Sequence, residues 1–226
     1  MYRLYLSSLF YNNMILLQTQ GVEPSIDVLG LLLKGGFVMI PLALLSVIAL
    51  IVIAERLMFF SNNMKVNDKD LTNLTDLLSQ GKKNEAIQLC KSSKGSWGRI
   101  FIYSGMTTED LDEVLEDAAN VEVARLEKGL GYLSMIAGLA PLLGFVGTIV
   151  GVITIFFDIS ISQDISISII SEGLYKKMIT SAAGLVVGII AFSAYHLFQH
   201  QLDGFVAKIQ EHSLALKVAL NKGSKN

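Results

Sequence analysis

Cysteine, tryptophan, proline and charged residues are all scarce in this sequence. Its 226 residues include one cysteine, one tryptophan and three prolines, and 17% of them are charged. Cys90 therefore cannot form an intramolecular disulfide, and its polar, lysine-rich surroundings predict a thiol on a helix face in a reducing compartment. The formal net charge of −2 gives no electrostatic reason to expect binding of nucleic acid.

Motifs for chemistry on a substrate are also missing. The sequence has no phosphate-binding loop, no nucleophile arrangement and no cysteine cluster. His196 and His200 have the spacing of two metal ligands on a helix, but no HExxH glutamate or third ligand accompanies them. We interpret them as a pair near a membrane boundary, and we predict no enzyme activity, no cofactor and no metal site.

Long uncharged runs are what the sequence has instead. Hydrophobic residues make up 52% of the chain, and runs without formal charge cover 35–54, 129–157 and, apart from two histidines, 178–202. About 20 apolar residues are enough for a helix to cross a bilayer. We therefore predict an all-α integral membrane protein embedded in the lipid bilayer, with three transmembrane helices at 35–56, 129–157 and 171–202.

Small residues recur on one face of the second and third predicted spans. Lipid does not require such a face, but a neighbouring helix does, because small residues let two backbones approach closely. We predict helix packing through five glycines, of which the last two form a GxxxG pair: Gly144, Gly147, Gly151, Gly184 and Gly188.

Three hydroxyl side chains lie among these glycines, namely those of Thr148, Thr180 and Ser181. Two interpretations stay open for each of them. The hydroxyl can line a hydrated path through a helix bundle, or it can bond the carbonyl four residues earlier in its own helix.

The region 57–128 between the first two spans is soluble in character and is predicted to be helical. It contains two short amphipathic helices, at about 68–79 and 82–91, and then a Gly/Ser stretch. Thr107 and Asp110 match a capping box. The helix that starts there is expected to run without a break into the second span.

Basic residues predict the orientation in the membrane. Ten of them lie in 56–128 and four in 203–226, whereas two lie in 1–34 and none lies in 158–170. By the positive-inside rule, the loop 57–128 and a tail helix at 203–226 face the cytoplasm. The N-terminus and a short connection at 158–170 then face outward.

The first 34 residues are expected to form a periplasmic or interfacial segment. Their apolar core is interrupted and no small-x-small cleavage site follows, so an amphipathic interfacial segment is favoured over a cleaved signal peptide. Translation from Met1 or from Met14 stays open.

A run of acidic residues precedes the second span. We interpret it as a solvated helix face or a contact between subunits; it comprises Glu109, Asp110, Asp112, Glu113, Glu116, Asp117, Glu122 and Glu127.

Three motifs together resemble a known family. The stretches GGFVMIPLALLSVIALIVIAER, APLLGFVGTIVG and MITSAAGLVVGIIA, in this order and around a large insertion, are similar to the spans of the ExbB/TolQ/MotA proton-channel family, and most similar to ExbB. The resemblance covers nearly the whole chain.

The resemblance implies a homopentamer in the inner membrane of a Gram-negative bacterium, with a pore lined by the second and third helices. It also implies a dimer of a single-span ExbD-like partner inside the pore and coupling to a TonB-like protein. In such proteins, proton flow through the partner's aspartate is thought to rotate the pentamer. Thr148 and Ser181 match the family's hydroxyl positions in the two pore helices.

One residue departs from the family pattern. Members usually carry a glutamate eight residues before the glycine at position 184, where this sequence has Lys176. A lysine there favours an ionised aspartate on the partner and lowers the proton affinity of that aspartate.

Three explanations of this departure stay open. The acid function has moved one helical turn to Glu172, which also suits an i, i+4 ion pair with Lys176. Alternatively, Lys176 docks the partner's aspartate. In the third explanation, Lys176 and Lys177 merely extend to the outer membrane interface, since Lys176 lies about 35 Å of helix from Gln199.

Two classes of function follow. The first is an ExbB-like motor or channel subunit that uses the proton-motive force for TonB-dependent transport, with a TolQ-like role in envelope maintenance as its variant. The second is a non-conducting scaffold, or a subunit of a mixed assembly, that holds a single-span partner.

Overall fold

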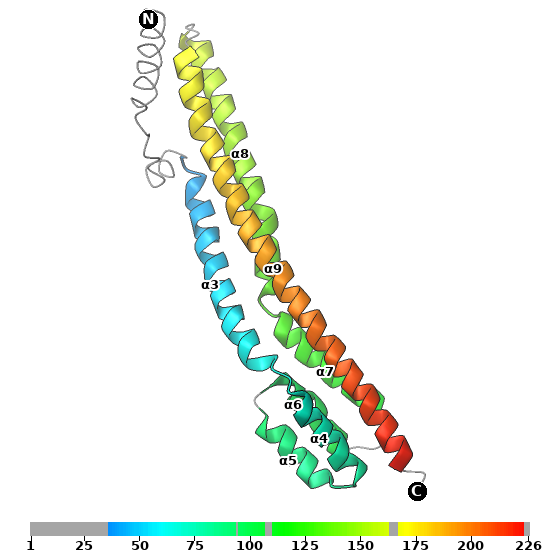
Figure 1. The fold of residues 1–226 in the computed structure, drawn as a ribbon. Helices are drawn as coiled ribbons and strands as arrows, with labels where there is room; N and C mark the ends of the chain where they lie inside the picture. Colours follow the sequence, from blue (N-terminus) through cyan, green and yellow to red (C-terminus); the bar gives the residue numbers. More distant parts are fainter. Residues whose placement is uncertain (1–35, 94, 107–109, 163–166, 224–226) are drawn as a thin grey trace, which may run out of the picture.

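The computed structural model describes residues 36–93, 95–106, 110–162 and 167–223, and its described residues are mainly helical (Figure 1). In chain order the elements are α3 (Met39–Asn63), α4 (Asp68–Ser79), α5 (Lys83–Ser92), α6 (Ser96–Phe101), the 3-10 helix η1 (Ile102–Gly105), α7 (Leu111–Glu127), α8 (Leu130–Ser162) and α9 (Ile167–Gly223).

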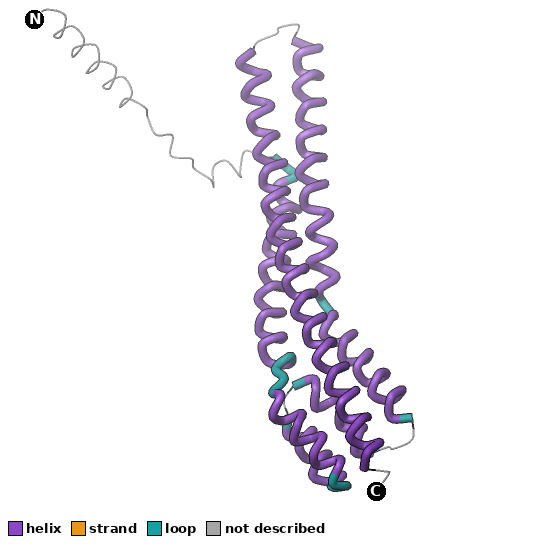
Figure 2. Tube along the Cα trace, turned by 45° about the vertical axis from the view of Figure 1, so that its right-hand side comes forward, coloured by secondary structure: helices purple, strands orange, loops and turns teal. Residues whose placement is uncertain are grey.

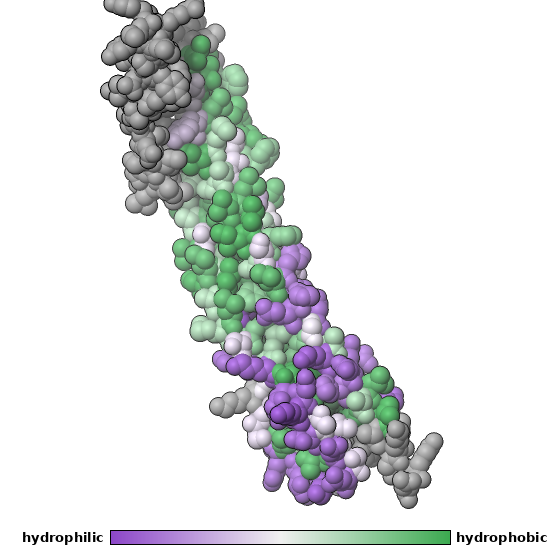
Figure 3. All heavy atoms as spheres, in the orientation of Figure 1, coloured by the Kyte–Doolittle hydropathy of each residue, from purple (hydrophilic) through white to green (hydrophobic). Residues whose placement is uncertain are grey.

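The helices form an elongated molecule with an apolar end and a polar end. Helices α8 and α9 run side by side, and α3 lies along them (Figures 1 and 2). Helices α4 to α7 gather around the lower half of α9 (Figure 1). The surface is hydrophobic along the upper and middle part and hydrophilic at the lower end (Figure 3).

Three of the described helices are long and apolar enough to cross a membrane: Met39–Asn63, Leu130–Ile161 and Gly173–Val218. No strand occurs among the residues that the structure describes. The prediction of an all-α chain with three such helices is therefore confirmed for this part of the chain.

Buried residues follow the helical period along each long helix. On α3, Leu42, Ala49 and Arg56 are buried at seven-residue spacing, so only one narrow stripe faces the other helices. On α8 and α9 the buried positions recur mostly every three or four residues, as expected for two helices packed along a continuous seam. Most other apolar side chains of the three helices are exposed in the single chain.

The polar end has a small core of its own. The two short helices predicted at about 68–79 and 82–91 are confirmed as α4 and α5, and Gly81 between them has a φ of +74°. Trp97 lies in the short helix α6 and is 3% exposed, so its ring is part of this core.

The expected continuous helix from position 108 through the second span is wrong, because the chain breaks between α7 and α8. Helix α7 ends at Glu127, and Gly129 has a φ of +99°, a left-handed conformation that suits glycine. Arg56 of α3 occupies this joint. Its guanidinium donates to the Leu126 carbonyl at 3.4 Å and stacks 4.7 Å from the Phe59 ring centre.

Gly129 also gives Arg56 the space that it needs. A Cβ atom at position 129 would lie 3.1 Å from Arg56 Nε and 3.2 Å from its Cζ. Arg56 is 8% exposed, and Glu55 neutralises it through two hydrogen bonds of 2.6 and 2.7 Å. A side chain from the first span therefore packs into the joint between α7 and α8. The helical periodicity of residues 108–157 gives no information about this side chain.

Helix α9, in contrast, is continuous from the third span into the tail. Its 57 residues reach about 85 Å at 1.5 Å per residue, so the expected tail helix is the same helix as the third span. Helix α8 runs on to Ser162 and α9 begins at Ile167, so helices occupy most of the expected connection 158–170. Near the end of α8, the Ser160 hydroxyl donates a hydrogen bond of 2.7 Å to the Phe157 carbonyl of its own helix.

The predictions for residues 1–34 and for the capping threonine Thr107 fall outside the described residues. Asp110 precedes α7 with a φ of 53° and makes no side-chain capping bond.

We predict that Gly129→Ala lowers the thermal stability of the purified protein in detergent. An alanine in the left-handed region costs about 1–2 kcal/mol, and its methyl group would push against Arg56. Circular dichroism during heating measures the effect. Gly131→Ala is the control, because it lies inside α8 with open space around its Cα, and there alanine is the better helix former. Equal midpoints for the two variants would contradict the joint described here.

Candidate functional site

The closest approach between helices in the apolar part is the contact of α8 with α9, and glycines make it possible. A Cβ atom at Gly144 would lie 3.0 Å from the Thr180 carbonyl oxygen and 3.1 Å from Ser181 Cα. One at Gly184 would lie 2.6 Å from the Ala140 carbonyl oxygen. Each glycine thus faces backbone, which cannot move aside as a flexible side chain can.

In the neighbouring turns, glycines of one helix face mainly side chains of the other helix. A Cβ atom at Gly188 would lie 2.5 Å from Pro141 Cγ, and one at Gly147 would lie 2.8 Å from Thr180 Cγ2. Pro141 is inside α8 and has no N–H for the carbonyl of Ala137, beside which Gly188 packs. The structure therefore places these glycines between the two helices.

The Thr148 hydroxyl connects the two helices. Its Oγ1 lies 3.3 Å from the Gly144 carbonyl oxygen of its own helix and 3.2 Å from the Lys177 carbonyl oxygen of α9. One hydroxyl proton serves these two acceptors. The bond to the carbonyl four residues earlier, one of the two interpretations left open by the sequence, is therefore present, and a second acceptor comes from the neighbouring helix.

The other two predicted hydroxyls lie at the same contact. Thr180 is 0% exposed in the single chain, with its methyl group against Gly147. Ser181 is half-buried and its backbone faces Gly144. The structure thus brings Thr148, Thr180 and Ser181 together with the glycines of both spans.

Glu172 and Lys176 both belong to α9, where they are one helical turn apart. Their side chains lie outside the described part of the structure. Lys177 is described, and its side chain lies along α8. The Cγ, Cδ and Cε atoms of Lys177 lie across Gly151, where a Cβ atom would take their place. The missing side chain at Gly151 creates this space.

Comparison with known proteins now identifies the family. A model of the MotA/TolQ/ExbB proton channel family matches residues 81–211, more than half of the chain. The chain belongs to this family. The resemblance seen in the three span motifs is therefore confirmed, and the family is one of channels and transport components rather than of known enzymes.

Individual relatives agree with this assignment. The chain is 29% identical over 187 residues to ExbB-like 1 of Synechocystis sp., which covers 77% of this chain and 73% of the relative. It is 26% identical over 189 residues to the biopolymer transport protein exbB1 of Vibrio cholerae, covering 79% of this chain and 82% of the relative. It is also 31% identical over 105 residues to ExbB of Helicobacter pylori, a match that covers 46% of this chain and 69% of the relative. With its three apolar helices, the chain is a multi-pass membrane protein of the ExbB type.

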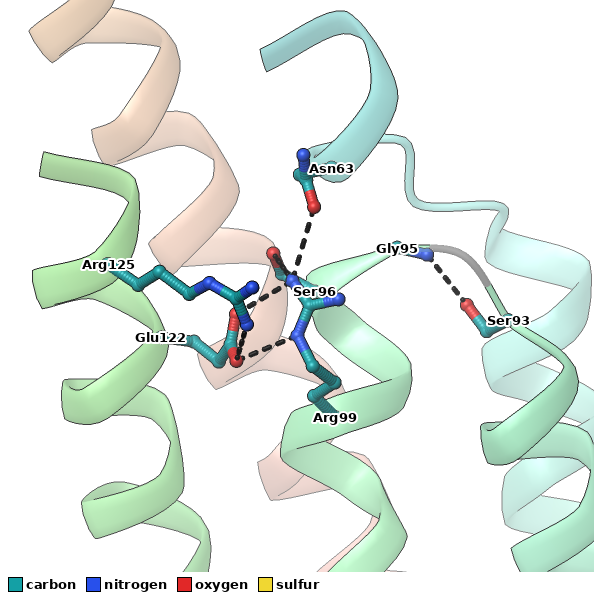
Figure 4. A network of polar contacts seen from close by, with 7 residues as sticks. All are labelled: Asn63, Ser93, Gly95, Ser96, Arg99, Glu122 and Arg125. Atoms are coloured by element: carbon teal, nitrogen blue, oxygen red, sulfur yellow. Dashed lines mark hydrogen bonds and ion pairs between the residues drawn. The ribbon is translucent and has the colours of Figure 1, made fainter. Parts of the chain in front are cut away.

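The polar end of this family member contains a network that joins three helices (Figure 4). Arg99 of α6 binds both carboxylate oxygens of Glu122 in α7, at 2.7 and 2.9 Å. It also donates to Ser96 at 2.9 Å and to Asn63, at the end of α3, at 3.2 Å. Arg125 adds a second positive charge 3.7 Å from Glu122. The network ties the end of the first span to α6 and α7.

The Glu122 side chain is 9% exposed, and two effects on its pKa compete. Burial raises the pKa of the carboxyl group. The hydrogen bond and charge of Arg99, the hydrogen bond with Ser96 and the charge of Arg125 outweigh burial and hold the pKa below its usual value of 4.5. Glu122 is therefore ionised when the protein is folded at neutral pH.

Glu122 was grouped in the sequence with acids on a solvated face, and for this residue that interpretation is wrong. The available signal was its position, because Leu115, Glu122 and Leu126 share the buried stripe of α7. Its partner Arg99 lies 23 residues earlier in the chain. No sequence motif marks Arg99 as the partner of Glu122. Other acids do lie at the surface, where Asp112 pairs with Lys217, and Asp68 lies 3.6 Å from Lys208.

Cys90 and His196, which the sequence singled out, both lie in described helices. Cys90 is 3% exposed in α5, and burial raises the pKa of its thiol to about 11, so the thiolate that reacts with oxidants is rare at neutral pH. His196 is exposed and has the Phe192 ring 4.2 Å from its own. Within the described residues, no group of three potential metal ligands comes together.

We predict that Glu122→Gln destabilises the folded protein at neutral pH. Loss of a charged hydrogen-bond partner costs about 1.5–3 kcal/mol, and we expect the lower part of this range because the Arg99 side chain is 36% exposed. Thermal unfolding measures the midpoint of Glu122→Gln. Glu116→Gln is the control, because Glu116 is an exposed acid of the same helix.

The pH dependence has a definite sign. Since the folded pKa of Glu122 is lowered, its stabilisation is complete above the ordinary carboxyl pKa of 4.5 and is lost as pH falls below that value. The stability difference between wild type and Glu122→Gln should therefore shrink below this pH. A difference that is constant from neutral to strongly acidic pH would contradict the ion-pair assignment.

Proposed function

We propose that this protein is an ExbB-like subunit of a proton-driven motor that energises transport across an outer membrane. Its work is to carry protons through the bilayer and to turn that flow into motion of a partner protein. Membership of a proton channel family and three membrane-crossing helices support the proposal.

The observation that carries the proposal is the hydrogen bond of Thr148 across the α8–α9 contact. Thr148 of α8 donates to the Lys177 carbonyl of α9 inside the apolar spans, and Thr180 and Ser181 of α9 border the same contact through a methyl group and backbone atoms. The Thr148 proton has two acceptors, one on each helix, so small rotations of the helices can redirect it. In an assembly, this group would border the ion path.

The proposed electrostatic control of the path lies further along α9. Because α9 is helical there, Glu172 and Lys176 are one turn apart. Glu172 would supply the acid function of the glutamate that family members usually carry at the position of Lys176. Alternatively, Lys176 would hold a carboxylate of the partner in its ionised form. Glycines 144, 147, 151, 184 and 188 would keep the two helices packed throughout the cycle.

The proposed assembly follows the family. Five copies would surround a dimer of an ExbD-like single-span protein, coupled to a TonB-like protein, in the inner membrane of a Gram-negative bacterium. The excess of basic residues in 56–128 and 203–226 supports a cytoplasmic location for the polar end. A TolQ-like role in envelope maintenance would use the same machinery.

A second candidate is a non-conducting scaffold that holds the single-span partner, alone or mixed with a conducting paralogue. The observation that favours it is Lys176, a base at the position where family members usually carry an acid. Exposed apolar faces on α3, α8 and α9 serve a scaffold as well as a motor.

Proton flux into liposomes that contain the protein with its single-span partner tests the two candidates. We expect flux in the wild type, and we expect Glu172→Gln to abolish it if the acid function has moved to that residue. Lys176→Met should alter the flux if Lys176 acts on the partner's carboxylate. Glu211→Gln is the matched control, because it removes an exposed acid from the same helix at the polar end.

Absence of flux from an intact wild-type complex would contradict the motor and support the scaffold. Equal flux in all four proteins would retain conduction but remove Glu172 and Lys176 from the mechanism.

A further inference from the structure

The Lys177 side chain lies against two segments that are distant from it in the sequence. It lies in α9 within a stretch apolar enough to cross a membrane. Its stem, formed by Cγ, Cδ and Cε, fills the space where a side chain at Gly151 of α8 would stand. Its ammonium nitrogen reaches the chain before α3, 3.8 Å from where a Cβ atom of Gly36 would be. One side chain thus extends from the third span across the second toward the start of the first.

The backbone of Lys177 takes part in the same contact. Its carbonyl oxygen accepts the hydrogen bond from Thr148 at 3.2 Å, and Thr148 and Gly151 are one turn apart on α8. The stem and the carbonyl of one residue are therefore held by two points on the same face of the neighbouring helix.

We propose that Lys177 is a positioning residue that fixes the register of α9 against α8 and so holds the Thr148 hydroxyl in place. The stem acts as a knob and Gly151 as the hole that receives it. The claim about register stands on geometry alone, whereas its effect on ion flow rests on the proposed function.

The register is sensitive to small displacements. A slide of α9 by one residue moves it by about 1.5 Å along the axis, which would carry the Lys177 carbonyl beyond hydrogen-bond distance of Thr148. Without the stem, the hole at Gly151 is empty, and its lining loses the van der Waals contacts that resist sliding.

The stem rather than the charge performs this role. The three carbon atoms make the contact with Gly151, while the ammonium group extends beyond it. Lys177→Met keeps an unbranched stem and removes the charge, and Lys177→Ala removes both. The two substitutions therefore separate packing from electrostatics.

The experiment is a double-mutant cycle on Gly151 and Lys177. It compares wild type, Gly151→Ala, Lys177→Ala, the double variant Gly151→Ala/Lys177→Ala and Lys177→Met. Gly138→Ala is the matched control on α8, because it has open space around its Cα. Each protein is measured in two ways: the unfolding midpoint in detergent, and proton flux per intact complex with the single-span partner in liposomes.

We expect each single alanine variant to lower flux by about tenfold, since a displacement of about 1 Å can cost more than this. The double variant should exceed both single variants in flux and midpoint, because the new methyl group enters the hole that the stem has left. Lys177→Met should stay within about twofold of wild type, as should Gly138→Ala, since volume-conserving changes are tolerated best.

Two outcomes would overturn the proposal. If Lys177→Met loses as much flux as Lys177→Ala, the charge is what matters and the register role fails. If the effects of Gly151→Ala and Lys177→Ala on the midpoint simply add, the two residues are not interlocked. A wild type without flux, whose midpoints still show the rescue, would refute the motor and leave the register role standing.

Discussion

The structure depends on how closely α8 and α9 approach each other. In a bilayer, burial of apolar surface does not drive two helices together, so close van der Waals contact has to do so. Gly144 and Gly184 allow backbone to meet backbone, and any larger residue would separate the helices. The hydrogen bond from Thr148 to Lys177 adds about 0.6 kcal/mol on the scale measured for such bonds between membrane helices. Packing therefore holds the pair, and the hydrogen bond contributes a smaller part.

The polar end is attached to this pair through charged side chains at two sites. Arg56 leaves the first span to occupy the joint at Gly129, and Arg99 connects the end of α3 with α6 and α7. Both guanidinium groups have a carboxylate partner, which offsets the cost of burying them.

These arrangements suit a member of a proton channel family. Thr148, Thr180 and Ser181 lie at the contact between α8 and α9, where glycines leave room for them. A lysine stem occupies the same contact in this chain, across Gly151. Lys176 comes directly before it, so α9 carries two adjacent basic residues within a helix that is long and apolar enough to cross a membrane.

The sequence by itself determined the helical class, the three apolar spans, the two short helices α4 and α5, and the family. These features depend on local composition and period, which can be read along one chain. It also predicted the glycines of the second and third spans as packing residues, because a face of small residues is a local pattern.

Only the tertiary structure decided what depends on distant partners. Arg56, which lies 73 positions earlier, packs against the break at Gly129. The burial of Glu122 requires Arg99, and the position of the Lys177 stem requires Gly151. In each case a charged side chain lies inside the protein because another segment supplies a carboxylate, a carbonyl or an empty space. Helical spacing predicts which face of a helix a residue lies on, but it does not predict which groups a neighbouring segment presents to that face.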